Sequence, residues 1–271
     1  MNSIGIEISK NGITIGAVRY DRRAELLGKT FSPILDSAEN TLRTAAEAAV
    51  SLLNEVSLTA DDIDYVGVTV DSAVKDNIAY DSVLGKKTDL SAILKYLPVK
   101  KLVSVKRANA LAICEQIQTY GALYSIAYVE LDEKVGFGLL IGGKPYIGAN
   151  GLAADIAHTT VQRGGKKCAC GNCGCFEAYV SLDEYLNKSK DHAQYVSHLA
   201  CGITNVMNLF QPNVIVVGGR VAELGGDELL KEFSELVHKE QYARNSVNKT
   251  LIALPTAGPD AAVIGAALAG I

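Results

Sequence analysis

Polar and apolar residues alternate through the N-terminal segment, the period of strands that bury one face. Three consecutive strand-like runs cover residues 3–8, 13–20 and 24–31. Asn11 and Gly12, between the first two runs, suit a tight hairpin turn with positive φ. Behind the capping residue Ser37 the apolar period becomes helical, so a helix is predicted over residues 37–56.

The rest of the chain continues this pattern and then repeats it. The first half adds a buried strand, a short helix, a strand and a helix over residues 63–70, 89–97, 101–105 and 108–121. The second half shows strands, helices and one glycine-flanked strand over residues 124–131, 135–141, 144–149, 192–210, 213–219, 227–242, 250–255 and 261–271. Three antiparallel strands followed by alternating helices and parallel strands, written twice, predict two mixed α/β domains with a cleft between them.

The predicted domain boundary falls near residue 120. We assign residues 1–119 to an N-terminal domain and residues 120–258 to a C-terminal one, with a last helix at about 259–271 packing back onto the first. The longest irregular run, residues 149–178, contains most of the cysteines. A long loop inside a compact domain is usually functional or held by a metal.

Composition and charge narrow the class of protein. The chain has 271 residues, 48% of them hydrophobic, and a formal net charge of -4, so neither nucleic acid nor an anionic membrane is expected as a partner. The N-terminus has no long apolar run behind a basic start, so a cytoplasmic location is expected. In a reducing compartment, clustered cysteines hold metal more often than they form disulfides.

The cysteine-rich loop carries a family resemblance. The segment "GANGLAADIAHTTVQRGGKKCACGNCGCFEAYVS" resembles the signature of the ROK family, which comprises repressors, open reading frames and sugar kinases. Cys168, Cys170, Cys175 and Glu177 match its Cys-x-Cys-Gly-x-x-Gly-Cys-x-Glu motif, and His158 falls at the family's upstream zinc ligand. The segments "NLFQPNVIVVGGRV" and "GPDAAVIGAAL" extend the resemblance along the chain.

This resemblance implies a fold and a set of partners. It implies two ribonuclease H-like domains of the actin and hexokinase type, a small-molecule sugar or sugar phosphate as ligand, and a homodimer. A strand is predicted from about residue 3 with no helix-turn-helix before it, so the chain resembles the kinase-length branch. ATP and Mg²⁺ would be the cofactors of a working kinase.

A structural zinc site is the predicted role of the cysteine loop. The resemblance supplies His158, Cys168, Cys170 and Cys175 as ligands, and three thiolates with one imidazole close a tetrahedral shell. A closed shell leaves no position for water or substrate, which favours a structural site over a catalytic one. Cys173 is surplus and could replace His158 as the fourth ligand or be an exposed thiol. Cys114 and Cys201 lie in apolar helical patterns typical of core residues.

The position of the catalytic base departs from the family. ROK kinases open a helix with Asn-Asp-Ala-Asn-Ala, in which the Asp takes the proton of the sugar hydroxyl. Here Asn109 holds the register within "VKRANALAICE", which places Lys106 at the Asn position and Arg107 at the base. Arginine offers no acceptor, and losing a general base typically costs ~10²- to 10⁴-fold in rate. The chain thus resembles a sugar kinase without its base.

The expected nucleotide and sugar sites are also altered. The first phosphate hairpin reads Glu7-Ile8-Ser9-Lys10-Asn11 and the second Asp132-Glu133-Lys134-Val135-Gly136, where the family has glycine-rich turns. Glu7, Lys10 and Lys134 are the remaining candidate nucleotide contacts in these hairpins. Gly218 and Gly219 match the adenosine-side turn, and a plain strand-to-helix turn explains them equally. On the sugar side the resemblance implies contacts from Lys106, Arg107, Asn109, Asp155, His158 and Glu177.

Three hypotheses follow. The first is a ROK-family protein with lost or much reduced kinase activity that binds a sugar, a sugar phosphate or another small anion in the cleft. The second is an active ATP-dependent hexose or N-acetylhexosamine kinase with a substituted base. The third is a non-catalytic scaffold or regulatory partner that acts as an oligomer.

Overall fold

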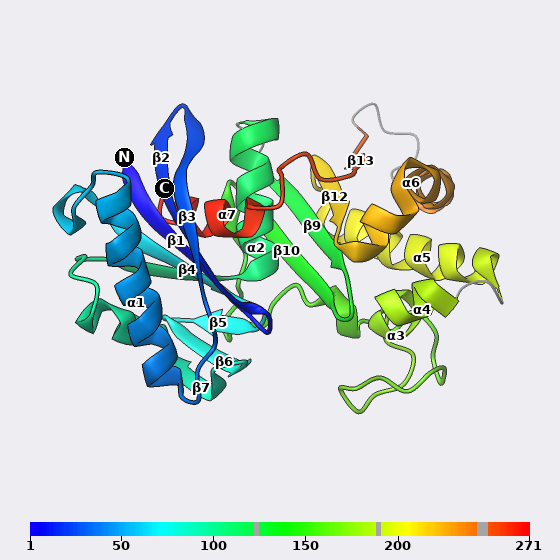
Figure 1. Ribbon diagram of the computed structural model, residues 1–271. Coiled ribbons are helices and arrows are strands. Elements are labelled where there is room, and N and C mark those ends of the chain that lie inside the picture. Colours follow the sequence, from blue (N-terminus) through cyan, green and yellow to red (C-terminus); the bar gives the residue numbers. More distant parts are fainter. Residues whose placement is uncertain (122–124, 188–190, 243–248) are drawn as a thin grey trace. The chain divides into compact units, whose positions relative to one another are not determined.

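The computed structural model describes residues 1–121, 125–187, 191–242 and 249–271 and divides into two compact units. Unit 1 comprises Met1–Ala122, Pro145–Ala153 and Thr256–Ile271, and unit 2 comprises Leu123–Lys144 and Ala154–Pro255. Residues 145–153, which the predicted boundary assigns to the second domain, therefore lie in unit 1. Each unit contains a mixed five-stranded sheet with helices packed on it (Figure 1).

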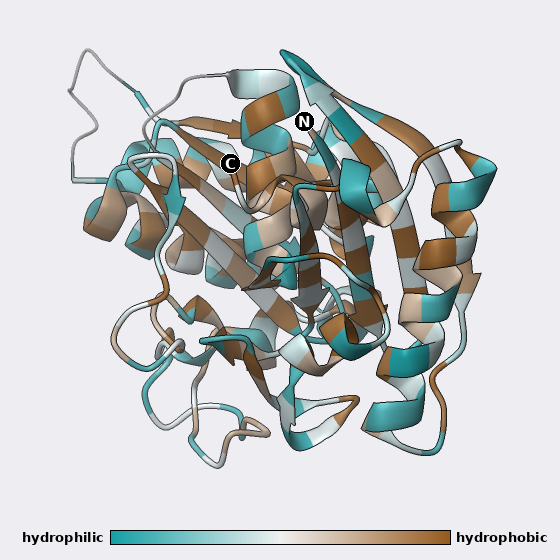
Figure 2. Ribbon diagram, turned by 90° about the vertical axis from the view of Figure 1, so that its left-hand side faces the viewer, coloured by the Kyte–Doolittle hydropathy of each residue, from teal (hydrophilic) through white to brown (hydrophobic). Residues whose placement is uncertain are grey.

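The sheet of unit 1 has the strand order β3-β2-β1-β4-β8. Its strands are β1 (Asn2–Ser9), β2 (Gly12–Asp21), β3 (Arg23–Ser32), β4 (Tyr65–Val70) and β8 (Leu102–Lys106). The first three pair antiparallel, and β4 and β8 join in parallel. The five strands predicted from the sequence for this half of the chain are confirmed. Hydrophobic residues recur along the strands (Figure 2).

Helices α1 (Ala38–Glu55) and α7 (Ala261–Leu268) cover opposite faces of this sheet. Alternate residues of β1 point to opposite faces, and Ile4 and Ile6 join the apolar core that includes α1. On the other face, a Cβ atom at Gly5 would lie 1.9 Å from the carbonyl oxygen of Val263 in α7. A Cβ at Gly67 of β4 would lie 1.8 Å from that of Ala266. The glycines therefore set how closely α7 can approach.

A small second sheet of unit 1 lies where the apolar pattern predicts no element. Its strands β5 (Ala73–Lys75), β6 (Ile78–Ser82) and β7 (Gly85–Asp89) form consecutive hairpins. Asp76 and Asn77 make the first turn with φ of 50° and 62°, and such residues tolerate positive φ. The strands are short and largely exposed, so they lack the alternation that reveals a strand in a sequence.

The second half of the chain builds the sheet of unit 2, in the order β11-β10-β9-β12-β13. The strands are β9 (Ser125–Leu131), β10 (Val135–Ile141), β11 (Lys144–Pro145), β12 (Val214–Gly218) and β13 (Leu251–Ala253). The predicted strand at 144–149 is wrong beyond Pro145, because this segment leaves the sheet at a proline. The first residue of the predicted strand 124–131 lies outside the described residues.

Two helical predictions change at their ends. The predicted helix 108–121 is α2 (Arg107–Glu115) followed by a π-helical turn, η3 (Gln116–Tyr120). The helix predicted from residue 227 is α6 (Arg220–Glu240), which continues across a kink at Gly226, where φ is 54°. The predicted helix is therefore the part of α6 that follows this kink, and the sequence does not predict the helical segment before it.

The remaining helices are short, except for one. They are η1 (Ala60–Asp62), η2 (Leu90–Lys95), η4 (Ile156–His158), α3 (Glu177–Val180), α4 (Leu182–Asn187) and the long α5 (His192–Phe210). Among the described residues, no helix combines the length and apolar character needed to cross a bilayer.

We expect Gly67→Ala to lower the free energy of unfolding by about 3 kcal/mol, the upper end of the range for overpacking. The added methyl would collide with the backbone of α7, which cannot move as a side chain can. Gly258→Ala is the matched control, because a Cβ there meets nothing within 4 Å, and should change stability by less than about 0.5 kcal/mol. Urea denaturation of both variants checks this, and equal midpoints would contradict it.

Candidate functional site

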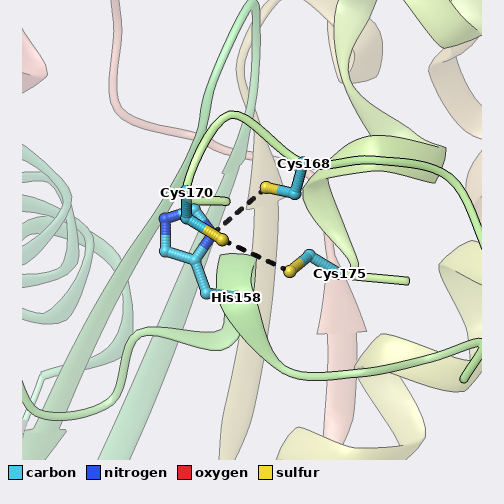
Figure 3. A group of neighbouring side chains, drawn as sticks. All are labelled: His158, Cys168, Cys170 and Cys175. Atoms are coloured by element: carbon cyan, nitrogen blue, oxygen red, sulfur yellow. Dashed lines mark hydrogen bonds between the residues drawn. The ribbon is translucent and has the colours of Figure 1, made fainter. Parts of the chain in front are cut away.

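His158, Cys168, Cys170 and Cys175 form a cluster in unit 2 whose ligand atoms all lie within 4.8 Å of one another. The Sγ atoms of Cys170 and Cys175 are 3.6 Å apart, and Cys168 Sγ is 3.6 Å from Nδ1 of His158 (Figure 3). Zn–S bonds of about 2.3 Å and Zn–N bonds of about 2.0 Å imply tetrahedral edges of about 3.8 and 3.5 Å. The two measured distances therefore agree with the edges of a tetrahedral zinc site.

The cluster forms because the cysteine loop turns back on itself. Cys168 N donates to Asn172 O at 2.8 Å, and Gly171 closes this turn with φ of 94°. Gly174 also has positive φ, and a Cβ there would lie 1.9 Å from the carbonyl oxygen of Gln162. Both glycines are therefore required by the backbone path that brings the ligands together.

Phe176 anchors the cysteine loop to the core of unit 2. Its side chain is fully buried, and Gly202 of α5 makes room for the ring, since a Cβ there would lie 2.2 Å from it. Phe176 N donates to Thr159 O at 2.9 Å. This bond ties the residue after Cys175 to the residue after His158, so the two ligands share one backbone bridge.

The pKa values of two thiols in the cluster are shifted in opposite directions. Burial raises the pKa of Cys175 to about 12, whereas a hydrogen bond from the backbone of Asn172 lowers the pKa of Cys170. A metal binds thiolates, so metal binding to Cys175 would release its proton.

The other cysteines lie apart from the cluster. Cys173 is exposed and its backbone bridges to Lys167, which leaves His158 as the fourth member of the group. Cys114 is buried in α2, where burial raises its pKa to about 12, and Cys201 is half-buried in α5. The geometry thus favours His158 over Cys173 as the fourth ligand.

Glu177 and Asp155 lie beside the cluster but differ in their surroundings. Glu177 Oε2 accepts the backbone N–H of Val135 at 2.9 Å, and its Oε1 lies 4.0 Å from Cys168 Sγ. Asp155 is exposed at the start of η4, just before the buried Ile156. Glu177 therefore links the β9–β10 hairpin to the cysteine loop.

Arg107, which stands at the position of the expected catalytic base, forms an ion pair within unit 1. Arg107 is the first residue of α2, and its Nε donates to Oε1 of Glu7 on β1 at 2.8 Å. The same nitrogen lies 3.6 Å from Oδ1 of Asp71, and the side chains of Arg107 and Glu7 are only 27% and 15% exposed. The guanidinium thus lies near two carboxylates, one of which, Glu7, is a candidate nucleotide contact.

The other predicted residues of unit 1 have separate environments. Lys106 Nζ lies 3.4 Å from the carbonyl oxygen of Ala153 and so holds the end of the 145–153 segment. Asn109 is fully buried in α2, and Lys10 is exposed at the tip of the β1–β2 hairpin. Arg107 and Glu7 are thus predicted residues of this unit that a direct contact joins.

The predicted nucleotide residues of unit 2 lie in two turns. Lys134 is exposed at the β9–β10 turn. Gly218 and Gly219 connect β12 to α6, and Gly219 has φ of 86° with Leu131 O 2.5 Å from its position for Cβ. This close approach explains the glycine at position 219 by the local structure, independently of any ligand.

Unit 1 also contains a cavity that the sequence does not predict. It has a volume of about 410 Å³ and is lined by Asp71, Ser72, Ala73, Tyr80, Asp81, Asn150 and Leu152. Two of its walls come from β5–β6, which the sequence does not predict, and from the 145–153 segment, where the predicted strand is wrong. Its signal in the sequence is only two aspartates, Asp71 between β4 and β5 and Asp81 within β6.

The comparisons with known proteins identify the class. The sequence model of the ROK family matches residues 3–191 and 184–269. The chain therefore belongs to the ROK family.

Relatives of the chain include both repressors and kinases. It is 27% identical over 296 residues to a putative xylose repressor of Caldicellulosiruptor sp., covering 88% of this chain and 70% of that protein. It is 25% identical over 253 residues to an N-acetylmannosamine kinase of Vibrio cholerae, covering 80% of this chain and 84% of the kinase. The chain spans less than half the length of three xylose repressors that it also matches.

Solved structures of ROK sugar kinases share the fold. A ROK hexokinase from Thermus thermophilus superposes with a TM-score of 0.84 at 20% identity, covering 99% of this chain and 97% of that one. A ROK glucokinase from Streptomyces griseus, in complex with glucose and AMPPNP, gives a TM-score of 0.72 at 19% identity over 98% of both chains. The predicted actin/hexokinase-type fold is confirmed.

We expect the Arg107–Glu7 pair to show a coupling free energy of roughly 1–2 kcal/mol in a double-mutant cycle. The cycle uses Glu7→Gln, Arg107→Gln and the double variant, with unfolding followed in urea. The pair is partly shielded from water, which reduces screening of the attraction.

Arg220 and Glu223 supply the control pair on α6, at 2.9 Å but with side chains 57% and 66% exposed. Their coupling should stay below about 0.5 kcal/mol. Equal coupling in the two cycles would show that the Arg107–Glu7 contact is an ordinary surface pair.

Proposed function

We propose that this protein is a ROK sugar-kinase homologue with lost or much reduced kinase activity that binds a sugar. The observation that carries the proposal is the ion pair between Arg107 and Glu7 at 2.8 Å. A guanidinium cannot accept the proton of a sugar hydroxyl. Glu7, the candidate carboxylate for a magnesium-bound water, is engaged by the same guanidinium.

The phosphate hairpins support the same conclusion. Phosphoryl transfer depends almost entirely on positioning and on stabilising charge around the phosphates. At the β9–β10 turn, Asp132 accepts the N–H of Glu133 at 2.9 Å and also lies 3.4 Å from the N–H of Arg220. A carboxylate therefore takes the backbone donors at a turn where the family places a nucleotide phosphate, and it would repel that phosphate.

The cavity of unit 1 supports a sugar as the ligand. Tyr80 and Leu152 are 37% and 62% exposed and offer apolar surface to the C–H face of a sugar ring. Asp71, Asp81 and Asn150 line the same cavity and can accept or donate hydrogen bonds to hydroxyl groups. Such a mixture of apolar surface and a few polar groups is typical of small-molecule sites.

The charge of this cavity favours an unphosphorylated sugar among the ligands that the sequence leaves open. Its lining includes two carboxylates and no lysine or arginine. The positive charge of Arg107, whose Nε lies 3.6 Å from Oδ1 of Asp71, is compensated by Glu7 and Asp71. A sugar phosphate would therefore meet net negative charge here.

We also propose that the cysteine cluster holds a structural zinc ion. The supporting observations are four ligand atoms within 4.8 Å of one another and the donor set of three sulfurs and one imidazole nitrogen. Zinc bound there would supply no open coordination position and would act by fixing the loop. His158, Cys168, Cys170 and Cys175 would be its ligands.

A ligand panel tests the proposed sugar binding. We expect at least one unphosphorylated hexose or N-acetylhexosamine to raise the melting temperature and bind in calorimetry, with no sugar-dependent consumption of Mg–ATP. Tyr80→Ala should weaken that sugar about 10-fold, the size of one lost apolar contact surface. Phe31→Ala, which removes another exposed aromatic ring of unit 1, is the control and should bind normally.

Other outcomes of this panel select the competing functions. ATP turnover stimulated by one sugar would establish an active kinase. A protein that binds no sugar, sugar phosphate or nucleotide but sediments as a stable oligomer would instead be a scaffold or regulatory partner. Preference for a sugar phosphate would contradict the electrostatic reading of the cavity.

For the metal, we expect about one zinc per chain by elemental analysis. Cys168→Ser should lose most of the bound zinc, because a serine hydroxyl stays protonated and is a poor ligand beside thiolates. Cys173→Ser should keep it, since Cys173 lies outside the cluster. Removing the metal with a chelator should lower the melting temperature; unchanged stability would rule out a structural role.

A further inference from the structure

The side chain of Tyr179 in α3 contacts the cysteine loop at Lys166, which lies between the ligands His158 and Cys168 in the sequence. The backbone N–H of Lys166 donates to the Tyr179 hydroxyl oxygen at 2.7 Å. A Cβ at Gly165 would lie 1.9 Å from the same oxygen. The backbone at Gly165 therefore packs directly against the hydroxyl and leaves no room for a side chain at this position.

Lys166 is fixed on its other side as well. Its carbonyl oxygen accepts the N–H of Gly174 at 2.7 Å. Lys166 precedes Cys168 by two residues, and Gly174 directly precedes Cys175. Lys166, whose N–H is held by Tyr179 and whose carbonyl holds Gly174, thus joins the two strands of the loop that carry the ligands.

The Tyr179 ring is itself held by α5. It is 5% exposed and stacks on His198 with a centroid distance of 4.1 Å and an interplanar angle of 25°. His198 Nε2 lies 3.0 Å from Oε1 of Gln162 in the loop. Burial lowers the pKa of His198, so at neutral pH the neutral ring can donate its Nε2–H to this oxygen.

The side chain of Lys166 also contacts the Tyr179 ring. Lys166 Nζ lies 5.2 Å from the centroid of the Tyr179 ring, within range of a cation–π contact, and pairs with Glu184. Lys166, Tyr179 and His198, here called the brace, also line a cavity of about 300 Å³ in unit 2. The brace thus holds the loop through backbone, ring and charge contacts that involve none of the metal ligands.

We infer that Tyr179, backed by His198, is a positioning residue for the metal: it fixes the cysteine loop and thereby sets how tightly zinc is held. This inference rests on the zinc site proposed above. Metal ligands need placement to within about 0.2 Å, and partners outside the coordination shell typically change metal affinity 10- to 100-fold. The hydroxyl acts through the peptide of Lys166 and touches no ligand.

The test measures zinc release from the full-length, zinc-loaded protein into a chromogenic chelator at neutral pH. Tyr179→Phe keeps the ring and removes the acceptor of the Lys166 N–H, and should speed release about 10-fold or more. His198→Ala removes the stacking partner from a partly exposed position and should have an effect in the same direction. The melting temperature of each zinc-loaded variant is recorded alongside, to separate loop positioning from general loss of stability.

Tyr195→Phe is the matched control. Tyr195 lines the same cavity, but its hydroxyl donates to Val180 O at 3.1 Å and not to the loop. Zinc release from this variant should stay within about twofold of wild type. The visible spectrum of the cobalt-substituted proteins should report tetrahedral coordination in every variant, because the ligands are unchanged.

Two results would overturn the inference. Release from Tyr179→Phe at the wild-type rate would show that the hydroxyl does not position the loop, and equal acceleration by Tyr195→Phe would assign the effect to general loosening. A wild-type protein that takes up no zinc would refute the metal site itself, a failure distinguishable from both because no variant is needed to see it.

Discussion

The close contact between helix α7 and the central strands of unit 1 is the constraint on which the rest of that unit depends. Glycines at positions 5, 67 and 265 let backbone meet backbone, and a Cβ at Gly265 would lie 1.8 Å from the carbonyl oxygen of Ala110 in α2. α7 therefore holds β1, β4 and α2 at once. Since α2 begins with Arg107 and β1 carries Glu7, this packing fixes the two residues whose ion pair defines the altered site.

Glu115, at the other end of α2, shows how the same helix secures the chain where it enters α7. The carboxylate is fully buried and accepts the N–H groups of Thr256 and Ala257 at 2.8 and 2.9 Å, together with the hydroxyl of Thr256. A buried carboxylate costs free energy unless such bonds satisfy it. The α2 helix is thus held at both ends by carboxylate interactions, at Arg107 to β1 and at Glu115 to the segment before α7.

Much of the fold could be predicted from the sequence, because its strands leave alternating or continuous apolar runs and its helices leave an apolar face at helical spacing. The β5–β7 sheet could not, since its strands are short and exposed and depend on the turn at Asp76 and Asn77. For the site, the loop motif pointed to His158 and the cysteines, and the register around Asn109 pointed to Arg107. The partners of Arg107 could not be predicted, because Glu7 lies 100 residues and Asp71 lies 36 residues away in the chain.

The position of Glu177 changes what its presence can be taken to mean. It matches the family's sugar-contacting carboxylate, which at first favours a working sugar site. In the structure one oxygen accepts the N–H of Val135 and the other lies near Cys168. A residue that joins the β9–β10 hairpin to the cysteine loop has a structural role whether or not a sugar is phosphorylated. The base position is different, because the reaction needs a proton acceptor there and an arginine cannot supply one. The functional conclusion therefore depends on Arg107 rather than on the intact cysteine motif.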